Sequence, residues 1–286
     1  MKLLLGRLNK KDTRILSIQS SFFSVILAFF YKVKIIVRVS EDPCGATRYA
    51  DNRIFAFIVF LTKLITYNFS YKIITNASKS KICVKKFILN KKKVGLLFNP
   101  SIKIIRSFKN FKRKKYILNV GRFCKQKNQI FLIKTFYEFN KIDNTYKLIL
   151  CGDGPDKKKL IRAVKILKLD NKVEFISWNK NLSKFYKNAR LFILSSYYEG
   201  MPNALIEAIN YETPSISTNC SGVKEILLNG KGGQIIKNFD PKCFSKIMIK
   251  TLKNYDSSIS KTLKAKKNLH KFEIKLASEK YLRFMR

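Results

Sequence analysis

The chain has 286 residues, of which 46% are hydrophobic, and a formal net charge of +41. This length and composition are typical of a globular protein with room for two domains and sizeable cores. The positive charge has two interpretations, and the sequence leaves both open. It reflects either a codon bias toward A and T, spread over solvated faces, or a basic surface for an anionic membrane or nucleic acid.

The cysteine and histidine content argues against a metal centre. No C-x-x-C pair occurs among the scattered cysteines, so we expect neither a zinc site nor a compact disulfide framework, but reduced thiols in a cytosolic compartment. The single histidine, His270, lies among lysines, which argues against a His-ligated metal or a Ser-His-Asp triad. The six cysteines are Cys44, Cys83, Cys124, Cys151, Cys220 and Cys243.

In the first third of the chain, short apolar strands alternate with helices. Strands are predicted at Arg14–Ile18, Val33–Val39, Lys72–Thr75 and Lys93–Leu97, helices at Phe22–Tyr31, Arg53–Phe69 and Lys79–Phe87, and a loop at Ser40–Asn52. Two apolar stretches, Phe22–Tyr31 and Ile54–Leu61, are shorter than the roughly 20 residues of a membrane-spanning helix. We expect them to form buried helices, with shallow contact with a membrane interface as the alternative.

The chain start carries no recognisable targeting or nucleotide-binding signal. We expect no signal peptide, because Asp12-Thr13-Arg14 separate the basic first residues from any apolar run. The opening Met1–Arg7 also lacks the strand and glycine-rich turn with which a complete doubly wound domain usually begins. We therefore expect a shortened N-terminal domain.

After a basic segment at Ser101–Lys115, which we interpret as a linker, the alternation of strands and helices resumes. Strands are predicted at Tyr116–Val120, Lys147–Cys151, Val173–Ile176, Leu191–Leu194, Pro214–Thr218 and Gly232–Ile236. Helices are predicted at Asn128–Phe139, Asp156–Leu167 and Leu182–Ala189, and a helical tail at Asp240–Arg286. Such alternation predicts an α/β fold with largely parallel sheets and helices on both faces.

Two carboxylates, Glu199 and Glu207, bracket the turn Gly200-Met201-Pro202-Asn203 directly after an apolar strand. Ligands bind at this edge of an open α/β sheet, where the free N–H groups of a helix start attract anions. A carboxylate at the same place requires hydroxyl groups that donate hydrogen bonds to it. A phosphate combined with sugar hydroxyls indicates a nucleotide sugar. Pro202 suits the first helical position, and Asn203 could orient a ligand or cap the helix.

Three further turns follow predicted strands. Gly121-Arg122, with Lys127 at a helix start, could hold a diphosphate through a guanidinium fork and a point charge. The turn Gly152-Asp153-Gly154-Pro155 is expected to be structural, although its loop could approach a ligand. Gly222 suits a loop packed against a phosphate or sugar, and Glu225 could cap the helix that follows.

These elements together carry a family resemblance. From Tyr116 to Ile236 the chain closely resembles the donor half of the GT-B glycosyltransferases of family 4, the glycosyl transferases group 1. The resemblance implies two facing Rossmann-like domains and a retaining hexosyltransferase of EC class 2.4 that uses a UDP- or GDP-sugar, with no cofactor or metal ion. It places Arg122 and Lys127 on the diphosphate, Glu199 on the sugar hydroxyls as the candidate catalytic residue, and Glu207 on the ribose. Gly121, Gly154 and the backbone of Gly200, Met201, Pro202 and Asn203 would line the same pocket.

The first 104 residues resemble the acceptor half of the family more weakly. Many members place a histidine on the donor sugar where this chain has Ser40, Glu41 and Asp42, which form the candidate acceptor-side loop. The expected domains are residues 1–104 for the acceptor, residues 105–265 for the donor, and a C-terminal helix at 266–286 that packs back on the first domain.

The expected acceptor is a surface polysaccharide or lipid-linked glycan in a bacterium. The expected location is cytoplasmic, with a peripheral seat on the anionic inner face of the cytoplasmic membrane. Two other function classes stay open. One is an inactive, truncated transferase remnant that binds nucleotide sugar without turnover. The other is a nucleic-acid-binding protein, for which no recognition motif is present, so nucleic acid is not an expected partner.

Overall fold

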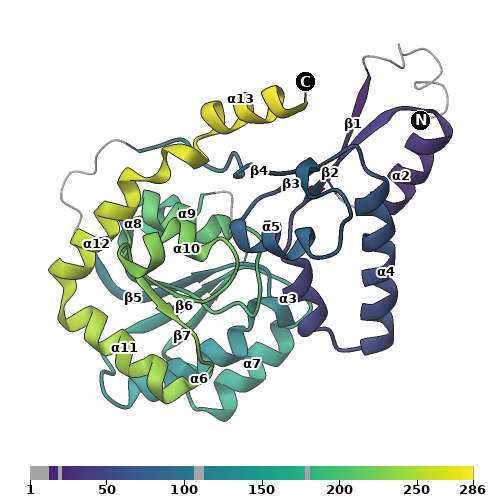
Figure 1. Cartoon of the computed structure of the whole chain (residues 1–286). Helices are drawn as coiled ribbons and strands as arrows, with labels where there is room; N and C mark the ends of the chain where they lie inside the picture. The colour runs from purple at the N-terminus through teal and green to yellow at the C-terminus, as the bar shows by residue number, and fades with distance from the viewer. Residues whose placement is uncertain (1–12, 19–20, 106–112, 178–180, 286) are drawn as a thin grey trace. The chain divides into compact units, whose positions relative to one another are not determined.

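The computed structural model describes residues 13–18, 21–105, 113–177 and 181–285. Contacts divide the chain into two compact units. The first comprises Met1–Pro100, Glu199–Met201 and Lys275–Arg286, and the second comprises Ser101–Tyr198 and Pro202–Ile274. Each unit contains one parallel sheet with helices (Figure 1), so the predicted α/β class is confirmed.

The first unit contains a four-stranded sheet in the order β1-β2-β3-β4. Its strands are β1 (Arg14–Ser17), β2 (Lys34–Val39), β3 (Lys72–Thr75) and β4 (Val94–Leu96). Its helices are α2 (Ser21–Phe30), α3 (Pro43–Arg48), α4 (Arg53–Phe69), α5 (Ser78–Lys85), the short η1 (Lys91–Lys93) and most of α13 (Ile274–Met285). All three strand pairs are parallel, because a helix or helical crossover returns the chain to the same end of the sheet each time.

The strand residues of the first unit alternate between two cores, as the two-residue period of a strand requires. Ile35, Val37 and Val39 of β2 join a core with side chains of α2 and α4. Ile36 of the same strand joins a second core with Tyr281 of α13. Phe284 of α13 fits closely there, since a β-carbon on Gly95 would lie 2.5 Å from its ring.

The prediction that Phe22–Tyr31 and Ile54–Leu61 form buried helices is wrong. Only Val25 and Ala28 of α2 belong to the core, whereas Phe29 is 71% exposed. Ile54 of α4 is 75% exposed. The reason is that both helices carry apolar residues on all sides, and the sheet covers only one of these sides. Among the described residues, no helix has both the length and the apolar character needed to cross a membrane.

The second unit contains a six-stranded parallel sheet in the order β10-β9-β8-β5-β6-β7. Its strands are β5 (Lys114–Val120), β6 (Lys147–Cys151), β7 (Val173–Ile176), β8 (Ala189–Leu194), β9 (Ser215–Thr218) and β10 (Gln234–Ile236). Its α-helices are α6 (Gln129–Asn140), α7 (Lys157–Ile166), α8 (Ser183–Asn188), α9 (Asn203–Asn210), α10 (Val223–Ile226), α11 (Pro241–Lys253) and α12 (Tyr255–Lys267). Three short 3₁₀ helices are η2 (Lys125–Lys127), η3 (Leu228–Gly230) and η4 (Leu269–Phe272).

Helices cover both faces of this sheet. Figure 1 shows α6, α7 and α11 along one side of the sheet, and α8, α9, α10 and α12 along the other. A large core lies under α6 and includes Phe136 and Phe139 together with Phe244 of α11. The central strands read as continuous apolar runs because they are buried on both sides.

Two local predictions differ from the structure. The predicted loop at Ser40–Asn52 contains the helix α3, which begins with Asp42 as N-cap and Pro43 in the first turn. The last helix begins at Ile274 rather than at residue 266, because α12 ends at Lys267 and η4 follows. Met1–Arg7, and residues 106–112 of the predicted linker, lie outside the described residues.

Candidate functional site

The sheet of the second unit reverses its direction of growth between β5 and β8. From β5 the chain proceeds outward through β6 and β7, and it then returns to β8 on the opposite side of β5. In open α/β sheets, ligands bind outside the carboxyl ends of the strands at such a switch point. The amide of Asn119 in β5 donates a hydrogen bond of 2.8 Å to the Ile193 carbonyl in β8. The loops that leave β5 and β8 therefore flank the site that the topology favours.

The loop after β5 contains Gly121, Arg122 and Lys127, which were selected from the sequence. A β-carbon placed on Gly121 would lie 3.7 Å from Cδ of Lys127, so the lysine stem lies over the glycine. Arg122 is exposed, and the described residues give its guanidinium neither a hydrogen bond nor an ion pair. The two cationic side chains thus belong to one loop at the switch point.

Gly152 and Gly154 hold the neighbouring loop against the loop that follows β5. A β-carbon on Gly152 would overlap the carbonyl oxygen of Gly121, and one on Gly154 would overlap that of Phe123. Two backbone hydrogen bonds join the same loops, from Phe123 N–H to Asp153 O at 2.8 Å and from Asp156 N–H to Phe123 O at 3.0 Å. The turn after β6 is therefore a structural support, and only glycine permits this approach.

The loop after β8 is tied to the Lys127 loop by three hydrogen bonds. The Ser195 hydroxyl donates to the Lys127 carbonyl at 2.8 Å. Tyr197 N–H donates to the Gln126 carbonyl at 2.8 Å, and the Gln126 side-chain amide donates to the Tyr198 carbonyl at 3.0 Å. Sequence reasoning missed Gln126, because nothing in its neighbourhood distinguishes a loop-bridging glutamine from a solvated one.

Glu199, Gly200 and Met201 follow directly, and all three are buried. Contacts group these three residues with the first unit. In the sequence, Glu199, Gly200 and Met201 belong to the same motif as residues 202–207. In the structure, the two parts of this motif belong to different units. Their roles toward a ligand stay a prediction.

Helix α9 begins one residue later than predicted. Pro202 is its N-cap rather than its first helical residue, and no side chain caps the helix. Asn203 is the first helical residue, and its side-chain oxygen accepts a hydrogen bond of 3.0 Å from the Ser101 hydroxyl. Pro202 thus gives the first N–H groups of α9 no side-chain cap, and the partial positive charge of a helix start attracts anions.

Glu207 lies in the second turn of α9 and is half-buried beside Tyr186. Burial raises the pKa of the Glu207 carboxyl, and the nearby Tyr186 hydroxyl lowers it by a smaller amount. Burial, followed by the Glu207 charge, raises the pKa of Tyr186 well above its usual range. Within the described residues, the Tyr186 hydroxyl makes no hydrogen bond of ordinary geometry. The Glu207 carboxylate thus lies in a partly apolar environment.

Arg113 is a structural residue that sequence reasoning missed, because it lies in the predicted linker. Its guanidinium donates to five backbone carbonyls and to the Thr213 hydroxyl. The carbonyl acceptors are Tyr186 at 3.4 Å, Lys187 and Ala189 at 3.0 Å, and Tyr211 and Glu212 at 2.9 Å, while the hydroxyl lies at 3.1 Å. These acceptors lie at the ends of α8 and α9, so Arg113 fixes the two helices that position Tyr186 and Glu207.

The candidate acceptor-side loop lies in the first unit after β2. Asp42 is buried and accepts the Cys44 N–H at 3.2 Å as the N-cap of α3, and it lies 3.8 Å from the Lys79 ammonium. Asp42 therefore stabilises the helix. Ser40 and Glu41 instead line a cavity of the first unit.

The expectation that every cysteine is a free thiol is wrong. Cys44 of α3 and Cys83 of α5 form a disulfide, with their Cα atoms 6.1 Å apart and 39 residues apart in sequence. Spacing alone does not reveal this pair, because the crossover between β2 and β3 brings the two helices together. Asp42 and the two sulfurs are close enough to form a metal-ligand group, but the sulfurs are bonded to each other. The expected absence of a metal stays a prediction.

The chain resembles known glycosyltransferases in sequence and in fold. The model of the family "Glycosyl transferases group 1" matches residues 101–271. An uncharacterized glycosyltransferase of Methanocaldococcus jannaschii is 42% identical over 118 residues, which are 41% of this chain and 29% of the relative. A Campylobacter jejuni α-1,4-N-acetyl-D-galactosaminyltransferase that acts on a diphospho-undecaprenol-linked glycan is 26% identical over 77% of this chain and 61% of the relative.

Solved structures agree with this relationship. The crystal structure of TarM superposes with a TM-score of 0.82 at 18% identity, covering 99% of this chain and 58% of TarM. Anabaena HepE in complex with UDP and glucose has a TM-score of 0.80 at 13% identity, covering 94% of this chain and 77% of HepE. The chain covers less than two thirds of the two sequence relatives and of TarM. Since the family match spans more than half of the chain and includes every loop of the switch point, the protein belongs to the glycosyl transferases group 1 family, with the GT-B fold of its solved structural neighbours.

Proposed function

We propose that this chain is a retaining hexosyltransferase that moves a sugar from a nucleotide diphosphate sugar to a hydroxyl of a glycan acceptor. The observation that carries the proposal is the convergence of the β5 and β8 loops at the switch point, with Arg122 and Lys127 in one of them. The complex of HepE with UDP and glucose supports a nucleotide-sugar donor for a chain of this fold.

The chemistry of sugar transfer requires that the charge developing on the departing diphosphate be neutralised. Arg122 offers a bidentate guanidinium and Lys127 a point charge. Both residues belong to the loop after β5, so one loop supplies both charges. The uncapped start of α9 adds backbone N–H donors of fixed direction. Donors arranged in advance around the leaving group are a large source of transition-state stabilisation.

Two carboxylates would orient the donor. We propose that Glu199 receives hydrogen bonds from the sugar hydroxyls and Glu207 from the ribose. The half-buried Glu207 supports this role, because a carboxylate in a partly apolar environment gains hydrogen bonds from ribose hydroxyls. Neither residue is assigned a nucleophilic role.

The relatives support a proposal for the class of acceptor. The Campylobacter jejuni relative acts on a lipid-linked glycan, which supports a glycan or lipid-linked acceptor for this chain.

A second observation supports an anionic membrane as partner. Helices α2 and α4 pack on each other and contain no acidic residue, and together they expose several phenylalanine and isoleucine side chains. The strongly positive chain is complementary to anionic lipids.

The proposed donor site is tested with UDP- and GDP-sugars, using calorimetry for binding and released nucleotide for turnover. Arg122→Met should weaken binding of UDP or GDP about tenfold or more, because a charged hydrogen-bond donor is lost. Arg162→Met is the matched control, since Arg162 is an exposed residue of α7. Glu199→Gln should lower kcat/KM more than Glu207→Gln.

The outcomes separate binding from catalysis. Equal and mild effects of the two glutamate variants would contradict the assignment of the carboxylates. Nucleotide binding without any sugar release from a broad donor panel would contradict the transferase activity and favour a binding-only protein. Tight, salt-sensitive RNA binding without nucleotide-sugar affinity would favour a nucleic-acid-binding protein.

A further inference from the structure

Two buried side chains hold the backbone of the cationic loop after β5 (residues 121–127), one near each end. Near the start of the loop, the side-chain amide of Gln129 donates a hydrogen bond of 3.1 Å to the Arg122 carbonyl. At its end, the Ser195 hydroxyl donates to the Lys127 carbonyl at 2.8 Å. Gln129 is 1% exposed, and Ser195 is fully buried. Each cationic residue is therefore held through its own backbone carbonyl by a side chain that solvent does not reach.

The local backbone explains how Gln129 reaches a residue seven positions earlier. Asn128, between η2 and α6, has a left-handed backbone conformation with a φ of 51°. Asparagine adopts this conformation more readily than most other residues besides glycine. The loop is also closed by a backbone hydrogen bond of 2.9 Å from Lys127 N–H to the Cys124 carbonyl. The chain thus turns sharply before α6, and the first side chain of this helix returns to Arg122.

The environment of Gln129 argues against a role in stability alone. Its side-chain oxygen is buried and has no hydrogen-bond partner within the described residues. A buried amide with one unpaired atom costs free energy, and an apolar side chain of similar shape avoids that cost. Gln129 therefore contributes little net stability to the fold. What the amide provides is a fixed position for the Arg122 backbone.

A fixed backbone matters for a loop whose two cations bind a diphosphate. Charged donors that are already in place stabilise a departing diphosphate without reorganisation, whereas a loose loop first has to become ordered. The residues that lock such donors are therefore as necessary as the donors themselves. Because Gln129 and Ser195 hold different residues, the loss of either one should act through the cation that it holds and not through the other.

We propose that Gln129 is the positioning residue of Arg122 in diphosphate binding. Ser195 has the same role toward Lys127. The assignment deepens the proposed function, on which it rests, because it names two residues that set the affinity of the donor site without touching the donor.

The test is a crossed set of double-mutant cycles on the full chain, with dissociation constants of UDP and GDP measured by calorimetry. Gln129→Met keeps the length of the side chain without its donor, and Ser195→Ala removes the hydroxyl. Each substitution is made in the wild type, in Arg122→Met and in Lys127→Met. Tm is measured for every variant.

Ser245→Ala is the matched control for Ser195→Ala. Ser245 is 2% exposed, and its hydroxyl donates to the Lys242 carbonyl at 2.8 Å within α11. This control therefore loses the same kind of hydrogen bond outside the loops of the switch point. Its Tm reports what the loss of such a bond does to stability alone.

We expect Gln129→Met to weaken nucleotide binding about fivefold in the wild type and in Lys127→Met, but less than about twofold in Arg122→Met. Ser195→Ala should show the converse, with about a fivefold loss in the wild type and in Arg122→Met and less than about twofold in Lys127→Met. Tm of Gln129→Met should stay within about 2 °C of the wild type. Ser245→Ala should leave nucleotide affinity unchanged.

Equal losses of affinity in all three backgrounds, or no loss in the wild type, would overturn the proposal. A large fall in Tm of Gln129→Met would also overturn it, because the amide would then serve the fold. If the wild type binds neither UDP nor GDP, the proposed function fails and the positioning roles fail with it. Additive cycles in a chain that binds UDP or GDP overturn the positioning roles alone, so the two failures are distinguishable.

Discussion

Replacement of Arg113 by Met should destabilise the second unit strongly. The guanidinium lies at the ends of α8 and α9 and satisfies six acceptors, among them five backbone carbonyls. Methionine fills a similar volume along the aliphatic stem but donates no hydrogen bond. The carbonyl groups at both helix ends would then lose their protein partner.

The magnitude follows from the number of N–H groups. The two terminal nitrogens of the guanidinium carry four N–H groups, and each net hydrogen bond contributes about 1 kcal/mol. Because Arg113 is half-buried, water can replace part of this interaction, and we expect a loss of about 3 kcal/mol. For a unit of this size, 1 kcal/mol corresponds to roughly 2–4 °C, so Tm should fall by roughly 6–12 °C.

The assay is thermal unfolding followed by circular dichroism and by calorimetry, with urea unfolding as an independent measure. Arg162→Met removes an equal charge from the exposed face of α7 and should change Tm very little. Arg113→Lys keeps the charge without the planar fork and should give an intermediate loss. If Arg113→Met and Arg162→Met shift Tm by the same amount, the inferred role of Arg113 is wrong.

Three further predictions concern other parts of the chain. Cys83→Ser should lower the free energy of unfolding of the first unit by about 4 kcal/mol, the value expected for a disulfide that closes a loop of 39 residues. Dithiothreitol should lower Tm of the wild type but not of this variant. Cys243→Ser, at an exposed free cysteine, is the control and should leave Tm unchanged. Glu207→Gln should raise Tm at pH 7, because burial raises the folded-state pKa of Glu207 and the wild type loses stability as pH rises through that pKa. The difference in Tm between variant and wild type should therefore shrink toward pH 4. If the carboxyl were solvated, there would be no difference at pH 7. The chain should sediment with phosphatidylglycerol vesicles but not with pure phosphatidylcholine vesicles. Phe29→Ser and Phe55→Ser should each weaken this binding about tenfold, whereas Leu89→Ser, at an exposed position outside α2 and α4, should not, and equal effects of all three would contradict a lipid-binding face.

Much of the fold could be predicted because local patterns agree with the tertiary structure. The predicted helix at Arg53–Phe69 and the predicted strands at Lys72–Thr75 and Lys147–Cys151 have the predicted bounds in the structure. Alternation of apolar strands with helices is sufficient to predict parallel sheets. The helix α3 was missed, although Asp42 followed by Pro43 is a helix-start signal, because a stretch rich in Asp, Pro, Gly and Thr also predicts a loop.

The solvent exposure of α2 and α4 could not be predicted from the sequence. A segment that is apolar all round is typical of a buried helix, but burial depends on how many sides its neighbours cover. The sheet of the first unit covers one side of each helix and leaves Phe29 and Ile54 exposed. The sequence therefore predicts the helices themselves but not what surrounds them.

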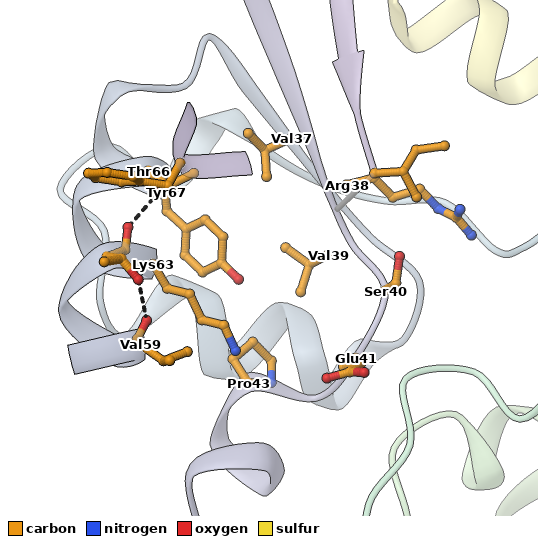
Figure 2. A pocket seen from close by; sticks show the side chains of 13 residues that line it. Val37, Arg38, Val39, Ser40, Glu41, Pro43, Val59, Lys63, Thr66 and Tyr67 are labelled. Atoms are coloured by element: carbon orange, nitrogen blue, oxygen red, sulfur yellow. Dashed lines mark hydrogen bonds between the residues drawn. The ribbon is translucent and has the colours of Figure 1, made fainter. Parts of the chain in front are cut away.

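The α/β class and the family could be predicted from the sequence, because glycine turns and paired glutamates at fixed spacing are local features of one chain segment. Only the tertiary structure showed that Gln126 joins two loops, that Arg113 holds two helix ends, and that Cys44 pairs with Cys83. It also revealed that Tyr67, Lys63 and Glu41 line one cavity of the first unit (Figure 2). These residues are distant in sequence, and hydrogen bonding, burial and disulfide formation depend on distances in space that no local pattern encodes.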